Sequence, residues 1–312
     1  MRQSSDIGVG FEVVRREPAV LIADLAFRWS FGVGAMGLFL LTSRRVKDAL
    51  VLGSAEQMQL ASGDLMAASQ ALARTLYNSL PYLVQALVIF LPVAALLWSV
   101  ATAAGRAVTT RLILARIQPW TPTAKVRWGA MLAVTFARVI VALLLLIGYT
   151  AATVAAAAAM QLGPTPNIFV GVFVFLAIFL VTLAVWSLVN FVVALAPIFV
   201  IRDRRPALDA LVDAVALTRF ASSRLVTVSM ANAVARFGSA LLLALAGFAV
   251  VVLARDLPTP VIGALATVVI VVYCLASDWL LLARYGSYVA VACDYGQNPA
   301  AQPAPGAEVA QA

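Results

Sequence analysis

Long, continuous apolar stretches recur along the 312-residue chain and are separated by shorter polar segments. A helix needs ~20 apolar residues to cross the hydrocarbon core of a bilayer, whereas the strands of a transmembrane barrel alternate over ~10 residues. The stretches here do not alternate. The pattern therefore predicts an all-α fold, a polytopic transmembrane helical bundle with about six spans in a membrane domain at 19–295. The predicted spans are 19–42, 82–105, 130–160, 167–201, 230–254 and 260–290.

The composition supports a membrane environment. Hydrophobic residues make up 63% of the chain and charged residues 12%, whereas soluble domains have roughly 45–50% apolar and about 25% charged residues. Such a chain cannot cover itself with polar surface in water. In lipid only helices and closed barrels satisfy every backbone polar group, so the non-alternating stretches again favour helices.

The polar segments between the spans carry patterns of their own. The N-terminal segment 1–18 and the tail 296–312 lie outside the spans, and the tail is rich in Ala, Pro and Gln, which is typical of disorder. The segment 44–80 predicts an amphipathic helix on the outer membrane surface. The segment 206–219 predicts a second, inner amphipathic helix. Its apolar face, a possible contact for a protein partner, consists of Leu208, Leu211, Val212 and Val215.

The distribution of Lys and Arg predicts the orientation. With the N-terminus inside, fourteen of the 22 basic residues fall in cytoplasmic segments, five fall in outer segments, and three lie within apolar stretches. Positively charged residues near the span ends are retained in the cytoplasm. Both termini are therefore expected in the cytoplasm, and the protein is expected to be a multi-pass protein of the bacterial cytoplasmic (inner) membrane.

Five ionisable residues interrupt the apolar stretches: Asp24, Arg28, Arg138, Arg236 and Asp278. A charge at the bilayer centre costs at least ~2.5–3.5 kcal/mol on insertion scales, so each is unusual. Asp24 and Arg28 are four residues apart and can pair on one helix face. All five map to the cytoplasmic third of the predicted bundle. We expect intramembrane charge pairing that involves Asp24, Arg28 and Asp278, with one positive charge in excess.

Three interpretations of these residues stay open. The arginines can extend their side chains to the inner interface and pair with the carboxylates, which is a structural role. Alternatively, Arg28, Arg138 and Arg236 bind a lipid phosphate or an anionic solute in a pocket that faces the cytoplasm. A third interpretation is a proton or ion relay through Asp24 and Asp278.

The sequence offers little for catalysis. Histidine is absent, and the two cysteines, Cys274 and Cys293, do not have the spacing of a metal site. No glycine-rich phosphate loop and no G-x-S-x-G motif is present. We therefore expect no catalytic residues, no metal, no cofactor and no enzymatic activity. The net charge of +8 is explained by topology and anionic lipid, so we expect no nucleic-acid binding.

Some stretches resemble known groups of proteins. The segment Phe191–Arg224, FVVALAPIFVIRDRRPALDALVDAVALTRFASSR, resembles uncharacterised bacterial six-span proteins related to the membrane domain attached to some glycerophosphodiester phosphodiesterases. The stretches REPAVLIADLAFRWSFG, SLPYLVQAL and GRAVTTRLIL are similar to parts of hypothetical membrane proteins from acidobacteria. Neither group implies an activity. The catalytic phosphodiesterase domain is missing, and without histidine its chemistry does not carry over.

The expected function is therefore that of a non-enzymatic membrane protein of the scaffold type. Its expected partners are membrane lipids, with anionic lipids as the candidates, or a protein that binds through 206–219. The alternative is a small-solute transporter or a permease subunit. Importer permeases carry a cytoplasmic EAA…G helix at a similar place, which here reads Asp213-Ala-Val-Ala-Leu-Thr-Arg219. The glycine expected shortly afterwards is absent, which weakens the permease interpretation.

Overall fold

The computed structural model describes residues 6–49, 54–61, 64–119, 126–160, 167–254 and 257–297. In these ranges the regular elements are helices, and no strand occurs. Most of the tail predicted to be disordered, 298–312, lies outside the described residues. The helices are α1 (Asp6–Arg16), α2 (Pro18–Ala49), α3 (Ser54–Ala61), α4 (Leu65–Ile117), α5 (Trp128–Met160), α6 (Ile168–Arg202), α7 (Ala207–Phe220), α8 (Ser222–Leu253) and α9 (Thr259–Gln297).

Six of the described helices are long and apolar enough to span a membrane, so the protein is a multi-pass helical membrane protein. The candidate spans contain 27 to 39 residues, and at about 1.5 Å per residue even the shortest exceeds the ~30 Å hydrocarbon core. They are Pro18–Arg44, Val88–Ile117, Trp128–Met160, Ile168–Arg202, Ser222–Leu253 and Thr259–Gln297.

The exposed surface of these helices is strongly apolar. Phe169, Phe173 and Phe237 are between 73% and 82% exposed. Large apolar side chains left open in such numbers would form patches that soluble monomers avoid. Lipid is the medium in which this exposure has no cost.

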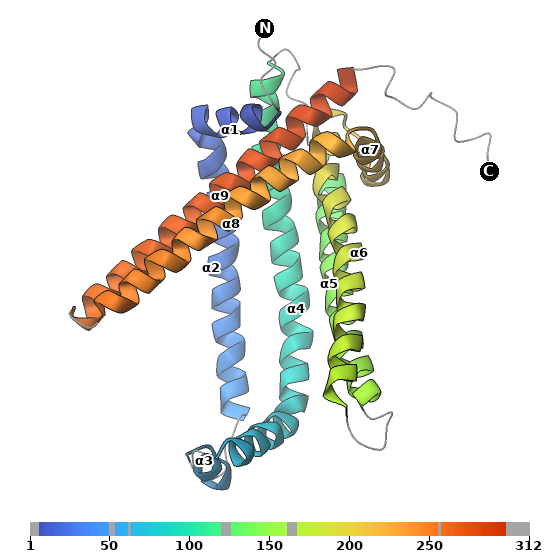
Figure 1. The fold of residues 1–312 in the computed structure, drawn as a ribbon. Helices are drawn as coiled ribbons and strands as arrows, with labels where there is room; N and C mark the ends of the chain where they lie inside the picture. The colour runs from blue at the N-terminus through green and yellow to red at the C-terminus, as the bar shows by residue number, and fades with distance from the viewer. Residues whose placement is uncertain are drawn as a thin grey trace, which may run out of the picture. The chain divides into compact units, whose positions relative to one another are not determined.

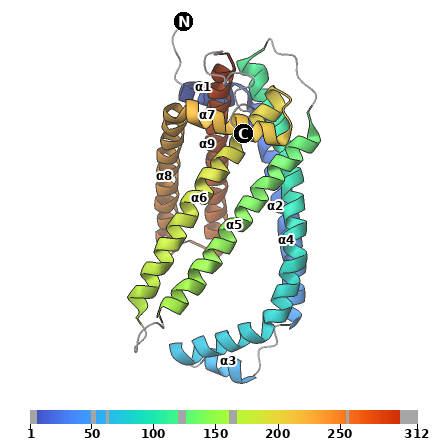
Figure 2. The same ribbon diagram turned by 90° about the vertical axis from the view of Figure 1, so that its right-hand side faces the viewer.

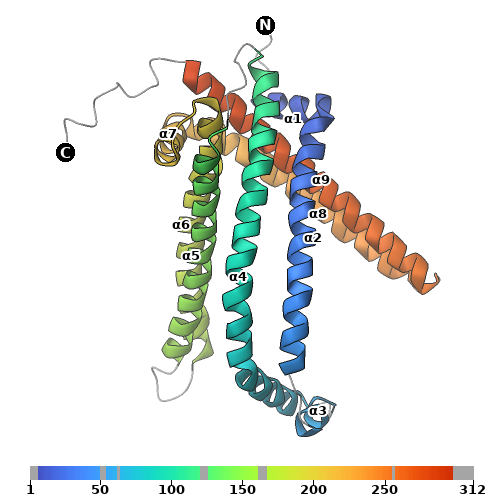
Figure 3. The ribbon, with the colours of Figure 1, turned by 180° about the vertical axis from the view of Figure 1, so that it is seen from behind.

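Contacts within the structure define two units, which we describe separately. Unit 1 contains residues 1–25 and 103–312, and unit 2 contains residues 26–102. Unit 2 comprises most of α2, all of α3 and the first part of α4. Figure 3 shows α4 bending in its N-terminal part, and Pro81 and Pro92 lie inside this helix. Proline removes a backbone hydrogen bond and clashes with the preceding turn, which accounts for such a bend.

Unit 1 is built from two helical hairpins. Helices α5 and α6 form one hairpin and α8 and α9 form the other, and α7 connects the end of α6 to the start of α8. The two hairpins meet at the end that carries α1 and α7, and their helices diverge toward the opposite ends (Figure 1 and Figure 2). We call this meeting place the α7 end. The orientation predicted above would place it in the cytoplasm.

The core of unit 1 lies at the α7 end. Most residues of α9 from Leu280 to Tyr295 are buried, and so are the last residues of α6 from Val193 to Ile201. Phe199 packs in this core with about 1% of its surface exposed. This part of α9 is mostly apolar, so most of its surface is buried, while Asp294 stays exposed.

Helix α1 crosses α9 with the two backbones in near contact. A Cβ atom added at Gly10 would lie 2.2 Å from the carbonyl oxygen of Ala283 and from Oγ of Ser287. One added at Gly286 would lie 3.2 Å from the Cα atom of Gly10. Small residues allow helices to approach this closely in membranes. The sequence analysis assigned no element to this N-terminal segment, so the helix is an addition from the structure.

Candidate functional site

The basic residues predicted to bind lipid or anion lie on different helices. Arg138 of α5 donates from Nε to Oδ1 of Asn190 on α6, at 3.0 Å. Arg236 of α8 approaches Oγ of Ser277 on α9, at 3.5 Å from Nη2. Both arginines belong to unit 1 and are half-buried, whereas Arg28 lies on α2 in unit 2, also half-buried. Each hydrogen bond joins two spans, and a shared ligand for the three arginines stays a prediction.

Of the two carboxylates predicted for the intramembrane pairs, one is buried and the other is half-buried. Asp24 lies on α2 in the part that belongs to unit 1 and is 4% exposed. Asp278 is half-buried on α9, next to Ser277. Their roles in charge pairing or in a proton relay stay predictions.

The structure adds two arginines to this group that the sequence analysis had counted only as span-flanking charges. Cζ of Arg106, on α4, lies 4.3 Å from the ring centroid of Tyr285. Cζ of Arg284 lies 5.7 Å from the ring centroid of Tyr288, one turn further along α9. The face of an aromatic ring attracts a cation at such distances. The i, i+4 spacing of Arg284 and Tyr288 is the sequence signal that could have revealed the second pair.

The two tyrosine hydroxyls join α9 to neighbouring helices. The hydroxyl of Tyr285 lies 2.7 Å from Oγ1 of Thr110 on α4. The hydroxyl of Tyr288 lies 2.7 Å from Oγ of Ser229 on α8. Hydroxyl groups can both donate and accept, so each pair keeps further hydrogen-bonding capacity. The ring faces and hydroxyls together fix the positions of the neighbouring arginines.

A second set of arginines, closer to the α7 end, is paired with carboxylates. Arg202 holds Asp203 through Nε at 2.8 Å and through Nη2 at 2.6 Å, and it also donates to the carbonyl oxygen of Ala292. Arg224 of α8 bridges Asp6 of α1 and Asp294 of α9. These contacts tie four helices together, and they explain the basic residues there as structural.

Helix α7 presents an apolar surface away from the bundle. Its buried residues are Ala210, Ala214 and Leu217, at i, i+4 and i+7. Of the four residues predicted to contact a partner, Leu211 is half-buried and packs against the core, and the other three are exposed. The exposed fractions are 75% for Leu208, 56% for Val212 and 36% for Val215.

The connection into α7 is basic and held in a defined conformation. Arg204 has a φ of 55°, a left-handed conformation that residues other than glycine rarely adopt. Nη1 of Arg127 donates to its carbonyl oxygen at 3.0 Å. Arg205 forms an ion pair with Asp213 of α7 at 3.2 Å. Burial raises the pKa of Asp213, and the charge of Arg205 only partly opposes this effect.

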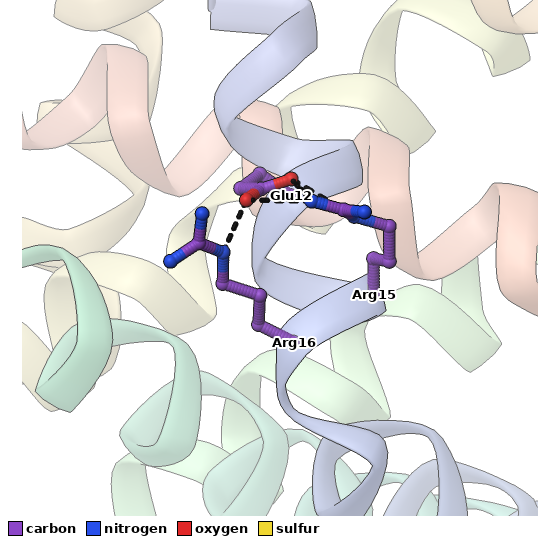
Figure 4. A network of polar contacts seen from close by, with 3 residues as sticks. All are labelled: Glu12, Arg15 and Arg16. Carbon is purple, nitrogen blue, oxygen red and sulfur yellow. Dashed lines mark hydrogen bonds and ion pairs between the residues drawn. The ribbon is translucent and has the colours of Figure 1, made fainter.

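Helix α1 carries an exposed charge cluster of its own. Figure 4 shows Glu12 between Arg15 and Arg16, one turn further along the helix. Nη2 of Arg15 lies 2.8 Å from Oε2 of Glu12, and Arg16 contacts Oε1. Hydrogen bonds from both arginines lower the pKa of Glu12. Because all three side chains are on one exposed helix face, the cluster stabilises α1 and leaves no free site.

No group of three potential metal ligands occurs in the part of the chain that the structure describes. Cys274 is exposed and Cys293 is buried, and both are free thiols. Two candidate binding regions therefore remain among the described residues. One is the group of arginines around Tyr285 and Tyr288, and the other is the exposed apolar surface of α7.

Comparison with known proteins adds no relative. The resemblance to the membrane domain of glycerophosphodiester phosphodiesterases and to acidobacterial membrane proteins therefore stays a prediction. No family model matches the chain, and no curated protein or solved structure is similar to it.

Proposed function

We propose that the protein is a non-enzymatic scaffold of the bacterial inner membrane that is held against the anionic inner leaflet by α7. The observation that carries the proposal is the exposed apolar surface of Leu208, Val212 and Val215 on a helix fixed between the ends of two spans. Such a helix lies at the level of the lipid headgroups. Its outward side chains would enter the boundary between headgroups and acyl chains.

The charges around this surface support a membrane rather than a protein as its occupant. Exposed arginines lie on both sides of it, Arg204 and Arg205 before α7 and Arg219 in its last turn. The inner leaflet carries a negative surface potential, which is worth ~1 kcal/mol for each nearby Lys or Arg. The acidic Asp209 is exposed on the edge of the helix, where it would point toward water, and Asp213 is half-buried and paired with Arg205.

Site-directed spin labelling tests this proposal. Val212→Cys would be compared with Asp209→Cys, both in a Cys274→Ala/Cys293→Ala background, in vesicles with and without phosphatidylglycerol. A nitroxide at 212 is expected to collide more with oxygen, which concentrates in lipid, and one at 209 more with a water-soluble nickel chelate. The contrast is expected to increase with phosphatidylglycerol. Equal exposure of both labels to water would contradict membrane docking and favour a protein partner for α7.

A small-solute transporter or permease subunit is the second candidate. Polar side chains within the spans favour it, since Arg138 meets Asn190 and Arg236 meets Ser277 between helices. A proton relay through Asp24 and Asp278 would be the mechanism. Proteoliposomes that contain a pH-sensitive dye would show proton flux, and Asp278→Asn would abolish it while Asp209→Asn would not. Equal and negligible flux for all three proteins would exclude this relay.

A further inference from the structure

Three arginines of unit 1 gather around the second half of α9 without a matching number of acids. Arg106 comes from α4, Arg236 from α8 and Arg284 from α9. Arg106 and Arg284 each lie over the ring of a tyrosine of α9, and Arg236 approaches Ser277 of the same helix. We call these residues, with Tyr285 and Tyr288, the arginine–tyrosine cluster.

The surrounding carboxylates do not neutralise this charge. Asp24 is buried on α2, and Asp278 is next to Ser277, which Arg236 approaches. Even if both carboxylates are set against Arg106, Arg236 and Arg284, one positive charge is in excess. Such an excess among half-buried side chains is costly unless an anion compensates it.

Unused hydrogen-bonding groups lie in the same region. Nη1 of Arg106 is buried and has no hydrogen-bond partner among the described residues. Oδ1 of Asn232, a residue only 5% exposed, also has none among them. Asn232 is on the same face of α8 as Ser229 and Arg236, at i, i+3 and i+7 from Ser229. Buried polar groups that stay unpaired destabilise the fold, so a missing partner is expected.

We propose that the arginine–tyrosine cluster binds a phosphate group, with Arg106 and Arg284 as its principal contacts. Guanidinium groups match phosphate oxygens in geometry and charge. Ser229 and Thr110 hold the tyrosine rings in place. The Ser229 hydroxyl already donates to the carbonyl oxygen of Leu225, whereas the Thr110–Tyr285 pair keeps one hydroxyl hydrogen that could be donated to a phosphate oxygen. The Asn232 amide can accept from a ligand hydroxyl or, turned over, donate to a phosphate oxygen. The phosphate can belong to an anionic glycerophospholipid or be free inorganic phosphate. The proposal does not depend on α7.

The full-length protein in dodecyl maltoside, freed of lipid, provides the test. Its thermal unfolding would be followed with phosphatidylglycerol, with zwitterionic phosphatidylcholine, and with sodium phosphate alone. The proposal expects a rise in unfolding temperature with phosphatidylglycerol or with sodium phosphate. Stabilisation by phosphatidylglycerol alone identifies a lipid headgroup, and stabilisation by phosphate alone identifies the free ion. The absence of stabilisation by either, or an equal effect of phosphatidylcholine, would overturn the proposal.

Charge-matched variants locate the site. Arg106→Gln and Arg284→Gln are expected to weaken binding of the stabilising probe about 10-fold or more, since each removes a charge-assisted hydrogen bond. Arg15→Gln removes the same charge from the exposed cluster on α1 and is expected to bind normally. Without probe, Arg284→Gln relieves repulsion and should unfold at the same or a higher temperature. If both cluster variants unfold at a lower temperature without probe, the arginines are structural and the proposal fails.

Discussion

A single missing methyl group at residue 10 determines how α1 docks. Because a Cβ atom there would lie 2.2 Å from backbone and side-chain oxygens of α9, only glycine permits this crossing. Val13 and Val14, both nearly fully buried, pack in the core beyond it. The glycine at residue 10 thus permits the whole of α1 to dock on α9.

Replacing Gly10 with alanine is therefore expected to destabilise unit 1. Overpacking of a tight core costs typically about 1–3 kcal/mol, so the unfolding temperature in detergent should fall by several degrees. Gly238→Ala on α8 is the control, because an added Cβ there meets nothing within 4 Å. The control should be neutral or slightly stabilising, since alanine favours the helix. Equal stability of the two variants would contradict the close crossing.

The buried edge of α7 predicts a pH effect at Asp213. Its pKa is raised above the ordinary 3.8 by burial, so the folded state holds the proton more tightly than the unfolded chain. Stability therefore decreases as pH rises from the unfolded value through the raised folded value. The Asp213→Asn variant has no carboxyl proton to lose. The ion pair that wild-type Asp213 forms with the half-exposed Arg205 contributes little to stability, so its loss in the variant has a small effect.

Thermal unfolding of wild type and Asp213→Asn between pH 4 and pH 8 would measure this effect. The unfolding temperature of the variant minus that of wild type should increase with pH. A difference that stays constant or decreases would show that ionised Asp213 does not destabilise the fold.

At the scale of an element, α7 has one face that packs in the core and another face that is exposed. Leu217→Ala removes a side chain that is fully buried, and such truncations typically cost about 2–5 kcal/mol. Leu208→Ala truncates a side chain that is 75% exposed. The free energy of unfolding of this variant in detergent should therefore differ from that of wild type by less than about 0.5 kcal/mol. Thermal unfolding of both variants checks this contrast. Equal losses would place Leu208 in the core.

The elements differ in how well sequence predicted them. The six long apolar helices are fixed by length and composition, so the all-α fold and the number of candidate spans are confirmed by the structure. The 3.6-residue periodicity also indicated a helix at 206–219, where α7 begins at Ala207 and ends at Phe220. Helix α1 was not predicted, because its position depends on Gly286 and Ser287, which lie more than 270 residues further along the chain.

The candidate site shows the same limit. Arg138 and Arg236 could be identified from the sequence, because each is a charged residue that interrupts an apolar stretch. Arg106 and Arg284 lie near span ends, where arginine is common, and only tertiary packing brings them to Tyr285 and Tyr288. Periodicity also cannot say which apolar face of α7 packs. Ala210, Ala214 and Leu217 face the core, whereas Leu208, Val212 and Val215 face outward.

At the scale of the whole molecule, the charge distribution predicts the orientation. In a Cys274→Ala/Cys293→Ala background, Met58→Cys on α3 would lie outside the cell and Asp209→Cys on α7 inside. A membrane-impermeant maleimide should then label residue 58 in intact spheroplasts and residue 209 only after permeabilisation. Labelling of residue 209 in intact cells would reverse the proposed topology.

The docking of α1 on α9 also constrains biogenesis. Helix α1 is synthesised well before the residues on which it docks, 283–287 of α9, which follow more than 250 residues later in the sequence. At about 5–20 residues per second, α1 waits for at least ten seconds before its partner exists. During this time the apolar face of α1 must be shielded from water by lipid or by a chaperone. Chains that stop before residue 283 would expose it permanently, which makes them natural targets for quality-control proteases.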